Sequence, residues 1–461
     1  MKIDIAPFLQ KVNKLKSRFN SLRLLFVKII MGSFQPASRT EASLLNELFI
    51  RPGTTELTTQ KIEATWKQSL MDMWLGDYAQ SSERRFHLAR SVSRKNLSDD
   101  FNFKPPLLHP EWGQAIGHLG HLGVYLRAQS RGLIGSKNSV LQIAHEDWLS
   151  SITLQTVGDL IPIEFRKLNS FISNLSTTWH LYDRIFCIKG LEDYTDVLKL
   201  QEKIFSSEVI SEKNALFPQN DRISDSALRN LSRDQYSRLQ QPYIAFHLRH
   251  KKSIEDPRIC SPSNYEGVFE EAKAAGFQVV IFGDTFFEFG FSLDNNVIDL
   301  RSTKRDFQSV IPYLLHNSKG LITTHSGPAP LAWSFGKPVL VTNCIHIDYF
   351  VLAASLNSLY LPKIWIDKNG DVIPLRKVYG TRLGQWGWSQ SHHLLNGARL
   401  QENSSVQLSL AAKHFLDGIK YGVRRDETMD IVDLIRFEKN SWGTGLISPS
   451  LFLGLGEKLL Q

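Results

Sequence analysis

Small polar and basic residues follow the predicted strands in the C-terminal half of the chain. In chain order they are His247 and Arg249, Gly283 and Asp284, Thr324, His325, Ser326 and Gly327, and Asn343. An arginine offers a planar fork that suits phosphate oxygens, and a helix start offers backbone N–H groups to an anion. These residue types at strand ends predict a site for an anionic ligand.

The stretch LITTHSGPAPLAWSFGKPVLVTN, residues 321–343, carries part of that prediction. It reads as an apolar strand, a group of small polar residues, a helix and a second apolar strand. Gly327 would allow a ligand close to the helix start, and Pro328 suits a first helical turn. The alternative is that Ser326 is only the N-cap of this helix. Arg249 follows another strand and adds a second anion-binding group, which favours the ligand site.

Motifs that the sequence lacks narrow the choice of anion. There is no GxxxxGK[ST] phosphate loop, no GxGxxG at a first βαβ unit, and no aspartate two positions from another aspartate. The stretch DKNGD at 367–371 departs from a calcium loop, because its glycine falls at the fourth place, and it predicts a hairpin instead. We therefore expect the diphosphate of a nucleotide-sugar, with no metal and no cofactor.

Strand-like and helix-like segments alternate from residue 240 onward, and they are the elements that must position these residues. Strands are expected at 243–248, 278–284, 296–300, 319–324 and 337–343, with an earlier strand at 139–144. Helices are expected at 263–277, 305–318 and 327–336. Strands separated by helices of this length predict a parallel, doubly wound α/β sheet, in which ligands bind beyond the carboxyl ends of the strands.

Several short motifs follow one another between about residues 105 and 418. They are IGHLGHLG at 116–123, H-x-R at His247 and Arg249, Gly-Asp at 283–284, a VIDL-type strand through Ile298 to Leu300, T-x-S-G at Thr324 to Gly327, and E-N-S at Glu402 to Ser404. Together they resemble a family of bacterial glycosyltransferases of the GT-B fold that is associated with surface-polysaccharide synthesis. His250 departs from the pattern, because an acidic residue often follows the arginine there.

The resemblance implies two Rossmann-type domains that face each other across a cleft, preceded by a helical extension. The expected divisions are a basic amphipathic helix at 1–35, a helical extension at 36–104, an acceptor-side α/β domain at 105–235, a nucleotide-sugar-binding α/β domain at 236–425, and a tail at 426–461. It also implies glycosyl transfer, hexosyl or related, to a polysaccharide or lipid-linked glycan acceptor.

Direct displacement at the anomeric carbon needs two helpers, which the candidate residues could supply. Charge on the departing diphosphate would be stabilised by Arg249 and the turn at 326–327. A base must take the proton of the acceptor hydroxyl, and histidine suits because its pKa lies near working pH. His118 is the predicted base and His121 the second candidate. His247 could instead orient Arg249, Asp284 could only cap a helix, and Asn343 could be only a turn residue.

Two other functions stay open. A sugar-nucleotide epimerase shares this architecture and would use the same diphosphate site, but it would need acid and base carboxylates at the sugar. The other is a catalytically idle scaffold that is attached to a membrane assembly by its N-terminal helix. Release of nucleoside diphosphate with and without acceptor separates transferase from epimerase, and absence of nucleotide binding would support the scaffold.

Charge and cysteine content limit the partners and the compartment. The 461 residues include 54 Lys and Arg against 46 Asp and Glu, a formal net charge of +8, which suits acidic ligands or anionic membranes without demanding nucleic acid. The three cysteines are far apart and form no CxxC, so no disulfide framework is predicted. We expect a cytoplasmic protein that binds no nucleic acid.

The first thirty residues form a basic, amphipathic pattern. They hold seven Lys or Arg and one Asp, and apolar residues recur at spacings of three and four. Lys28 and Arg23 interrupt the apolar run, which stays well below the roughly 20 residues that span a bilayer. The segment is predicted to lie at the inner face of the cell membrane; the alternative is a helix that docks on its own protein.

Deletion of residues 1–30 tests these two readings. The truncated protein is expected to lose binding to anionic vesicles, because the basic apolar face is removed. Co-sedimentation with phosphatidylserine vesicles and with neutral vesicles measures this. Equal retention of both forms on anionic vesicles would indicate the self-docking helix instead.

Overall fold

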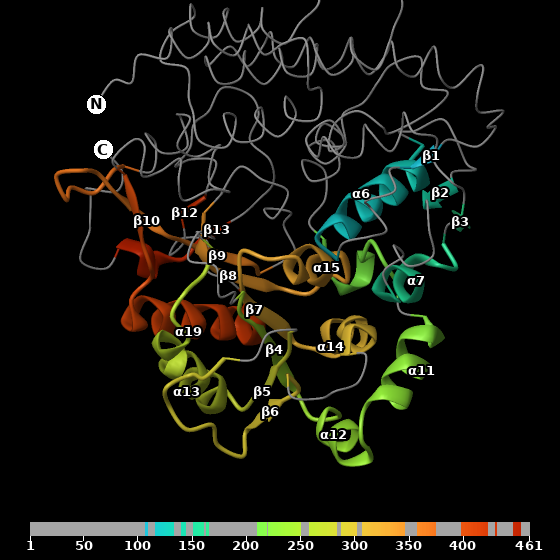
Figure 1. The fold of residues 1–461 in the computed structure, drawn as a ribbon, viewed down its shortest axis with the longest axis horizontal. Helices are drawn as coiled ribbons and strands as arrows, with labels where there is room; N and C mark the ends of the chain where they lie inside the picture. Colours follow the sequence, from blue (N-terminus) through green and yellow to red (C-terminus); the bar gives the residue numbers. More distant parts are fainter. Residues whose placement is uncertain are drawn as a thin grey trace, which may run out of the picture. The chain divides into compact units, whose positions relative to one another are not determined.

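Figure 1 shows the computed structural model of the chain. The residues that it describes are 107–108, 116–132, 140–143, 151–160, 163–165, 210–218, 220–249, 258–283, 287–301, 307–345, 357–374, 398–422, 429–430 and 446–452. The helices and strands in these ranges belong to one unit, made of residues 105–168 and 190–461. The N-terminal helix predicted at 1–35 and the extension predicted at 36–104 lie outside the described residues.

An eight-stranded sheet forms the centre of this unit. Its strands are β4 (Tyr243–His247), β5 (Gln278–Ile281), β6 (Val297–Asp299), β7 (Gly320–Thr324), β8 (Val339–Cys344), β9 (Leu359–Pro362), β12 (Met429–Asp430) and β13 (Leu446–Ile447). Their order in the sheet is β12-β13-β9-β8-β7-β4-β5-β6. All neighbours are parallel except β12 and β13, which are antiparallel. The predicted α/β class with a parallel sheet is confirmed.

The chain changes direction across the sheet between β4 and β7. From β4 it moves outward through β5 to β6, and then returns to form β7 on the other side of β4. From β7 it moves the opposite way, through β8 to β9. This is the topological switch point of a doubly wound sheet, the place where ligands of such sheets bind beyond the carboxyl ends of the strands.

Helices cover both faces of the sheet (Figure 1). On one face α13 (Glu266–Ala274) packs against α19 (Ser405–Tyr421), and Phe269 of α13 meets Phe246 of β4 with ring centroids 4.9 Å apart. On the other face α14 (Ile311–Asn317) packs against α15 (Pro328–Ser334), and the Tyr243 hydroxyl donates to the Leu314 carbonyl at 2.8 Å. The alternation of side chains along β4 thus buries both of its faces.

A second, smaller sheet lies nearer the N-terminus. It consists of three parallel strands, β1 (Leu107–Leu108), β2 (Val140–Ile143) and β3 (Ile163–Phe165). The short helix η2 (Ile116–His118) leads into α6 (Leu119–Ser130), and α7 (Ser151–Val157) follows β2. Two separate parallel sheets with helices are what a GT-B-like fold requires.

The predicted elements of the C-terminal half are confirmed, with shifted ends. The helix predicted at 263–277 is split into η5 (Pro262–Tyr265) and α13, and the one at 305–318 into η6 (Phe307–Val310) and α14. The predicted hairpin at 367–371 is present, with Ile366 bridged to Val372 and Gly370 at φ 92°. The other described elements are η4 (Glu212–Asn214), α11 (Asp221–Asn230), α12 (Arg233–Arg238), β10 (Ile364–Ile366), β11 (Arg399–Gln401) and η8 (Pro449–Phe452). Within the described ranges, every helix is too short or too polar to cross a bilayer.

Residues 212–217, which precede α11, are hydrogen-bonded and ion-paired to the C-terminal end of α15. Backbone N–H groups of Leu216 and Phe217 both donate to the Ser334 carbonyl, at 2.7 and 3.1 Å. The buried ammonium of Lys337 pairs with the Glu212 carboxylate in the same segment. His316 of α14 lies beside this pair. Its burial, and after that the positive charge of Lys337, lower its pKa from 6.5 to about 4.

The low pKa of His316 predicts a loss of stability in acid. The folded protein keeps His316 neutral until about pH 4, whereas the unfolded chain takes up the proton near pH 6.5. Protonation of His316 in the unfolded chain therefore favours unfolding in acid. The free energy of unfolding is unaffected by this above pH 6.5 and decreases as the pH falls from 6.5 toward 4. The variant His316→Gln should lose that part of the pH dependence. Urea unfolding midpoints at pH 8, 6.5 and 5 measure this pH dependence. If the midpoint changed equally with pH in the wild type and in His316→Gln, the prediction would be contradicted.

Candidate functional site

The motif residues of β4 and β7 meet at the switch point. His247 is paired in register with Thr323 of β7. Its Nδ1 lies 3.0 Å from the Ser326 hydroxyl and 3.3 Å from the Thr323 hydroxyl, and the two hydroxyl oxygens are 3.0 Å apart. We call His247, Thr323 and Ser326 the hydroxyl–imidazole cluster. Thr323 is fully buried and Ser326 nearly so, so their hydroxyls need partners within the protein.

Gly283, which follows β5, completes the surroundings of His247. Its φ of 141° is one that side chains rarely adopt. A Cβ at this position would lie 3.3 Å from His247 Cδ2 and 3.5 Å from Nε2, so the glycine also leaves room for the ring. The ring packs beside Phe282, with centroids 5.3 Å apart. Residues from β4, β5 and β7 therefore converge on one imidazole; Asp284 lies outside the described residues.

Arg249 is tied to the same place by its backbone. Its N–H donates to the Thr324 hydroxyl at 2.9 Å, which holds the chain after β4 against the end of β7. The Arg249 side chain is half-exposed. The predicted arginine thus lies at the carboxyl edge, one strand away from the turn at 326–327.

Ser326 is not the N-cap of α15. Gly327 occupies that position, and no side chain caps the helix. The Ser326 hydroxyl is turned toward His247 instead. Pro328 and Pro330 have no N–H, and the Ala329 N–H donates to the Ser326 carbonyl at 3.2 Å. The helix start therefore offers an anion fewer backbone donors than the sequence pattern implies, and side chains must supply the rest.

The predicted Gly-His element lies against the same turn. A Cβ on Gly327 would lie 2.5 Å from Ile116 Cγ2 and 3.1 Å from the Gly117 nitrogen, and a Cβ on Gly117 would lie 3.3 Å from Gly327 Cα. His118 ends η2 directly after this contact, and His121 lies in the first turn of α6. The structure therefore brings the backbone of the predicted base beside the turn; the side chains of both histidines lie outside the described residues.

His325 and Asn343 are buried in the protein. The His325 ring is 2% exposed, with Nδ1 3.9 Å from Cys344 Sγ. Asn343 is fully buried at φ 49°, and exchanges two bonds with Asn403: each backbone N–H donates to the other side-chain oxygen, at 2.7 and 2.9 Å. Its amide also donates to the Tyr265 hydroxyl at 3.0 Å. A ligand contact at Asn343 would have to displace one of these bonds, so donor binding there stays a prediction.

The late E-N-S motif fastens three segments together. Glu402 accepts a hydrogen bond from the Ser261 N–H at 2.8 Å, before α13. Asn403 donates to the Pro362 carbonyl at 2.7 Å, at the end of β9. Ser404 is the N-cap of α19 and accepts from the Gln407 N–H. These contacts give the motif a structural role at the carboxyl edge.

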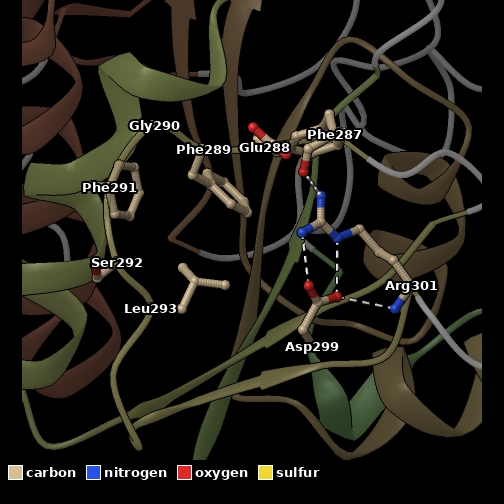
Figure 2. A pocket seen from close by; sticks show the side chains of 9 residues that line it. All are labelled: Phe287, Glu288, Phe289, Gly290, Phe291, Ser292, Leu293, Asp299 and Arg301. Atoms are coloured by element: carbon tan, nitrogen blue, oxygen red, sulfur yellow. Dashed lines mark hydrogen bonds and ion pairs between the residues drawn. The ribbon is translucent and has the colours of Figure 1, made fainter.

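A surface hollow of about 430 Å³ lies at the β5–β6 end of the edge (Figure 2). Its lining residues are Phe287, Glu288, Phe289, Gly290, Phe291, Ser292, Leu293, Asp299 and Arg301. Arg301 binds Asp299 through two nitrogens, at 2.9 and 2.7 Å, and lies 4.2 Å from the centre of the Phe287 ring. Its charge is thus balanced within the hollow, and the pair fastens the loop after β5 to the end of β6.

The residues that the structure describes contain no group of three or more His, Cys, Asp or Glu side chains placed to hold an ion.

Two other candidate groups have structural surroundings. The carboxylate of Asp367 accepts hydrogen bonds from the backbone N–H groups of Asn369 and Asp371 at 2.8 and 2.9 Å, which stabilises the hairpin. Cys260 is buried, and burial raises the pKa of its thiol to about 12, so it stays protonated at neutral pH.

Comparison with known proteins finds likeness only among solved structures. The chain matches no protein-family model and no curated protein. A glycosyl transferase of family 9 from Veillonella parvula is similar at 12% identity over 72% of this chain and 78% of that chain, with a TM-score of 0.27. The iron-containing heptosyltransferase TibC, solved with ADP-D-beta-D-heptose, is similar at 20% identity over 22% of this chain and 27% of that chain, with a TM-score of 0.17.

The UDP-GlcNAc 2-epimerase from Methanocaldococcus jannaschii is similar at 11% identity, with a TM-score of 0.22. The match covers 50% of this chain and 66% of the epimerase. This chain therefore spans about a quarter of the heptosyltransferase and just under two thirds of the epimerase. The α/β fold is established by the strand order and pairing above, and likenesses this weak carry no argument about activity.

The contact between the two glycines predicts the effect of a single methyl group. The variant Gly327→Ala should lower the free energy of unfolding by about 1–3 kcal/mol, because its Cβ would overlap Ile116 and the Gly117 backbone while φ remains allowed. Gly117→Ala is the graded control and should cost less, since its nearest contact is 3.3 Å. Urea unfolding measures both. An unchanged midpoint for Gly327→Ala would mean that η2 and α15 are not in contact.

Proposed function

We propose that the protein is a glycosyltransferase that moves a sugar from a nucleotide-sugar donor to a polysaccharide or lipid-linked glycan acceptor. The observation that carries the proposal is the convergence of three strand-end motifs at the switch point. His247 ends β4, and Gly283 and the turn at 323–326 lie at the ends of two other strands. Both of these lie against the His247 imidazole. In doubly wound sheets, this place beyond the carboxyl ends is where nucleotides and their phosphates bind.

The donor diphosphate would be bound at this edge by charged and polar side chains. Arg249 supplies the fixed positive charge, and its backbone is already held beside β7. His247, Thr324, Ser326 and Gly327 are the neighbouring groups, and Asp284, His325 and Asn343 stay secondary candidates. A guanidinium held in place stabilises the charge that develops on the departing diphosphate without a metal ion.

The acceptor would approach from the side of η2. His118 is the proposed base and His121 the second candidate. The contact between Gly117 and Gly327 supports this division, because it brings the backbone that carries His118 beside the proposed diphosphate site. Direct displacement at the anomeric carbon needs the base on the side of the sugar opposite the departing diphosphate, so His118 would face the diphosphate site across the bound sugar.

Location and partners follow from the same proposal. The proposed enzyme would work at the inner face of the cell membrane, where a lipid-linked acceptor would lie, held there by the basic segment 1–30. The mild positive charge of the chain suits that surface, since anionic lipids attract basic segments. No nucleic acid and no cofactor enter the proposal.

Arg249→Ala tests the proposed role. Turnover is expected to fall by about 100-fold or more, the loss typical when a group that stabilises transition-state charge is removed. The melting temperature should stay close to that of the wild type, because Arg249 is half-exposed and its backbone bond to Thr324 persists. Release of UDP, GDP or ADP from the matching sugar nucleotides, with and without membrane glycolipid acceptors, measures turnover.

Arg229→Ala, which changes an exposed arginine of α11, is the matched control and should keep full activity. Unchanged turnover of Arg249→Ala would overturn the phosphate assignment. Sugar interconversion without release of diphosphate would indicate an epimerase. Calorimetry that shows no binding of any of the three nucleotides would indicate a scaffold.

A further inference from the structure

We infer that Thr323 and Ser326 hold His247 in the tautomer that carries its proton on Nδ1. Thr323 is thereby a positioning residue for the imidazole, although it is absent from the predicted site. The inference begins with the carbonyl of Thr324. The Thr323 hydroxyl lies 3.0 Å from this oxygen, which can only accept, so the hydroxyl must donate its single hydrogen there.

The remaining hydrogens follow from that first bond. Thr323 Oγ1 has no hydrogen left for Ser326 Oγ at 3.0 Å, so Ser326 must donate to Thr323. Ser326 in turn has no hydrogen left for His247 Nδ1 at 3.0 Å, so Nδ1 must carry the proton and donate it. Nδ1 also lies 3.3 Å from Thr323 Oγ1, a second acceptor for the same N–H. Each group thus donates to the next: His247 Nδ1–H to Ser326, Ser326 to Thr323, and Thr323 to the Thr324 carbonyl.

The opposite tautomer would leave one contact without a hydrogen. If Nδ1 were an acceptor, the Ser326 hydroxyl would donate to it, and the single hydrogen of Thr323 could then serve either the Ser326 oxygen or the Thr324 carbonyl, each at 3.0 Å, but not both. Thr323 is fully buried and Ser326 6% exposed, so water does not readily repair that contact. An unmade bond of a buried polar group is unfavourable. The geometry therefore selects the Nδ1–H form.

The consequence is that Nδ1 carries the proton of the neutral ring, which leaves Nε2 as the basic nitrogen. A neutral His247 has its proton on Nδ1, and the imidazolium gains the second proton on Nε2, the side nearer to Gly283. This step rests on the proposed function: beside Arg249, an imidazole of fixed orientation would add a positive charge toward the diphosphate only when it is protonated. Thr323 then serves the donor site through His247, without touching the donor.

The experiment reads the tautomer directly in the protein without ligand. Long-range ¹H–¹⁵N correlation spectra of the full chain, labelled with ¹⁵N-histidine, distinguish Nδ1–H from Nε2–H, and the His247→Gln spectrum identifies the resonances. At a pH where the ring is neutral, wild type is expected to show Nδ1–H. Thr323→Val keeps the shape of the side chain and removes the hydroxyl, which frees Ser326 to donate to Nδ1 and should populate Nε2–H.

Thr342→Val is the matched control, because it changes a buried threonine of the neighbouring strand whose hydroxyl contacts Tyr265 and the Thr323 backbone carbonyl but neither His247 nor the Thr323 hydroxyl. It should keep the Nδ1–H form. A wild-type spectrum with an unprotonated Nδ1 would overturn the inference, whatever the variants do. An unchanged tautomer in a folded Thr323→Val would overturn the role of Thr323.

Activity provides a separate readout. In the transferase assay, kcat/KM of Thr323→Val should fall by about 10- to 100-fold, by analogy with the residues that orient metal-binding histidines, and its pH profile should change shape. An unchanged kcat/KM and pH profile would overturn the positioning role. If the spectra show Nδ1–H and the protein binds no nucleotide, the proposed function fails and the tautomer assignment stands. If transfer occurs and the wild type shows Nε2–H, the assignment fails alone.

Discussion

The pairing of β4 with β7 is the constraint on which the candidate site depends. These two strands are far apart in the chain, yet they are neighbours in the sheet, and the connections that leave them cover opposite faces. The first residues after each strand therefore meet at the switch point. His247, Arg249 and Ser326 are close together only because of this pairing. A strand order that did not pair β4 with β7 would separate the H-x-R and T-x-S-G motifs by at least one strand, about 5 Å for each strand inserted.

Burial of polar groups explains why the cluster is ordered. Thr323 and Thr324 have no exposed surface, and a buried hydroxyl without a partner costs about 1–3 kcal/mol. Each hydroxyl therefore takes part in a defined bond: Thr323 to the Thr324 carbonyl, and Thr324 from the Arg249 backbone. The bonds that satisfy the end of β7 also orient the imidazole and hold the segment that carries the arginine. Stability and positioning depend on the same contacts.

Close backbone approaches have a similar double role. Gly327 meets Gly117 because neither residue has a side chain, and this contact brings the N-terminal α/β part against the turn of α15. The Asn343–Asn403 pair joins the end of β8 to the start of α19, where the left-handed φ of Asn343 turns the chain. The E-N-S motif therefore contributes to the edge by holding its strands and helices in place, and the candidate ligand groups lie on the frame that results.

The sequence by itself determined the local structure and the residue types at the strand ends. Apolar runs with intervening helical patterns predicted β4 to β8 and the helices between them, because hydrophobic periodicity reports local conformation and burial. Short strands such as β12 and β13, with two residues each, carry too little pattern to be predicted. Only the tertiary structure decided that β7 pairs with β4, and that the Ser326 hydroxyl contacts His247 instead of capping α15. It also decided that Thr323 belongs to the cluster and that Asn343 is hydrogen-bonded to Asn403. These are contacts between residues about 60 to 80 positions apart, and such contacts depend on strand order and on the geometry of buried hydrogen bonds, neither of which is written in the periodicity of any one segment.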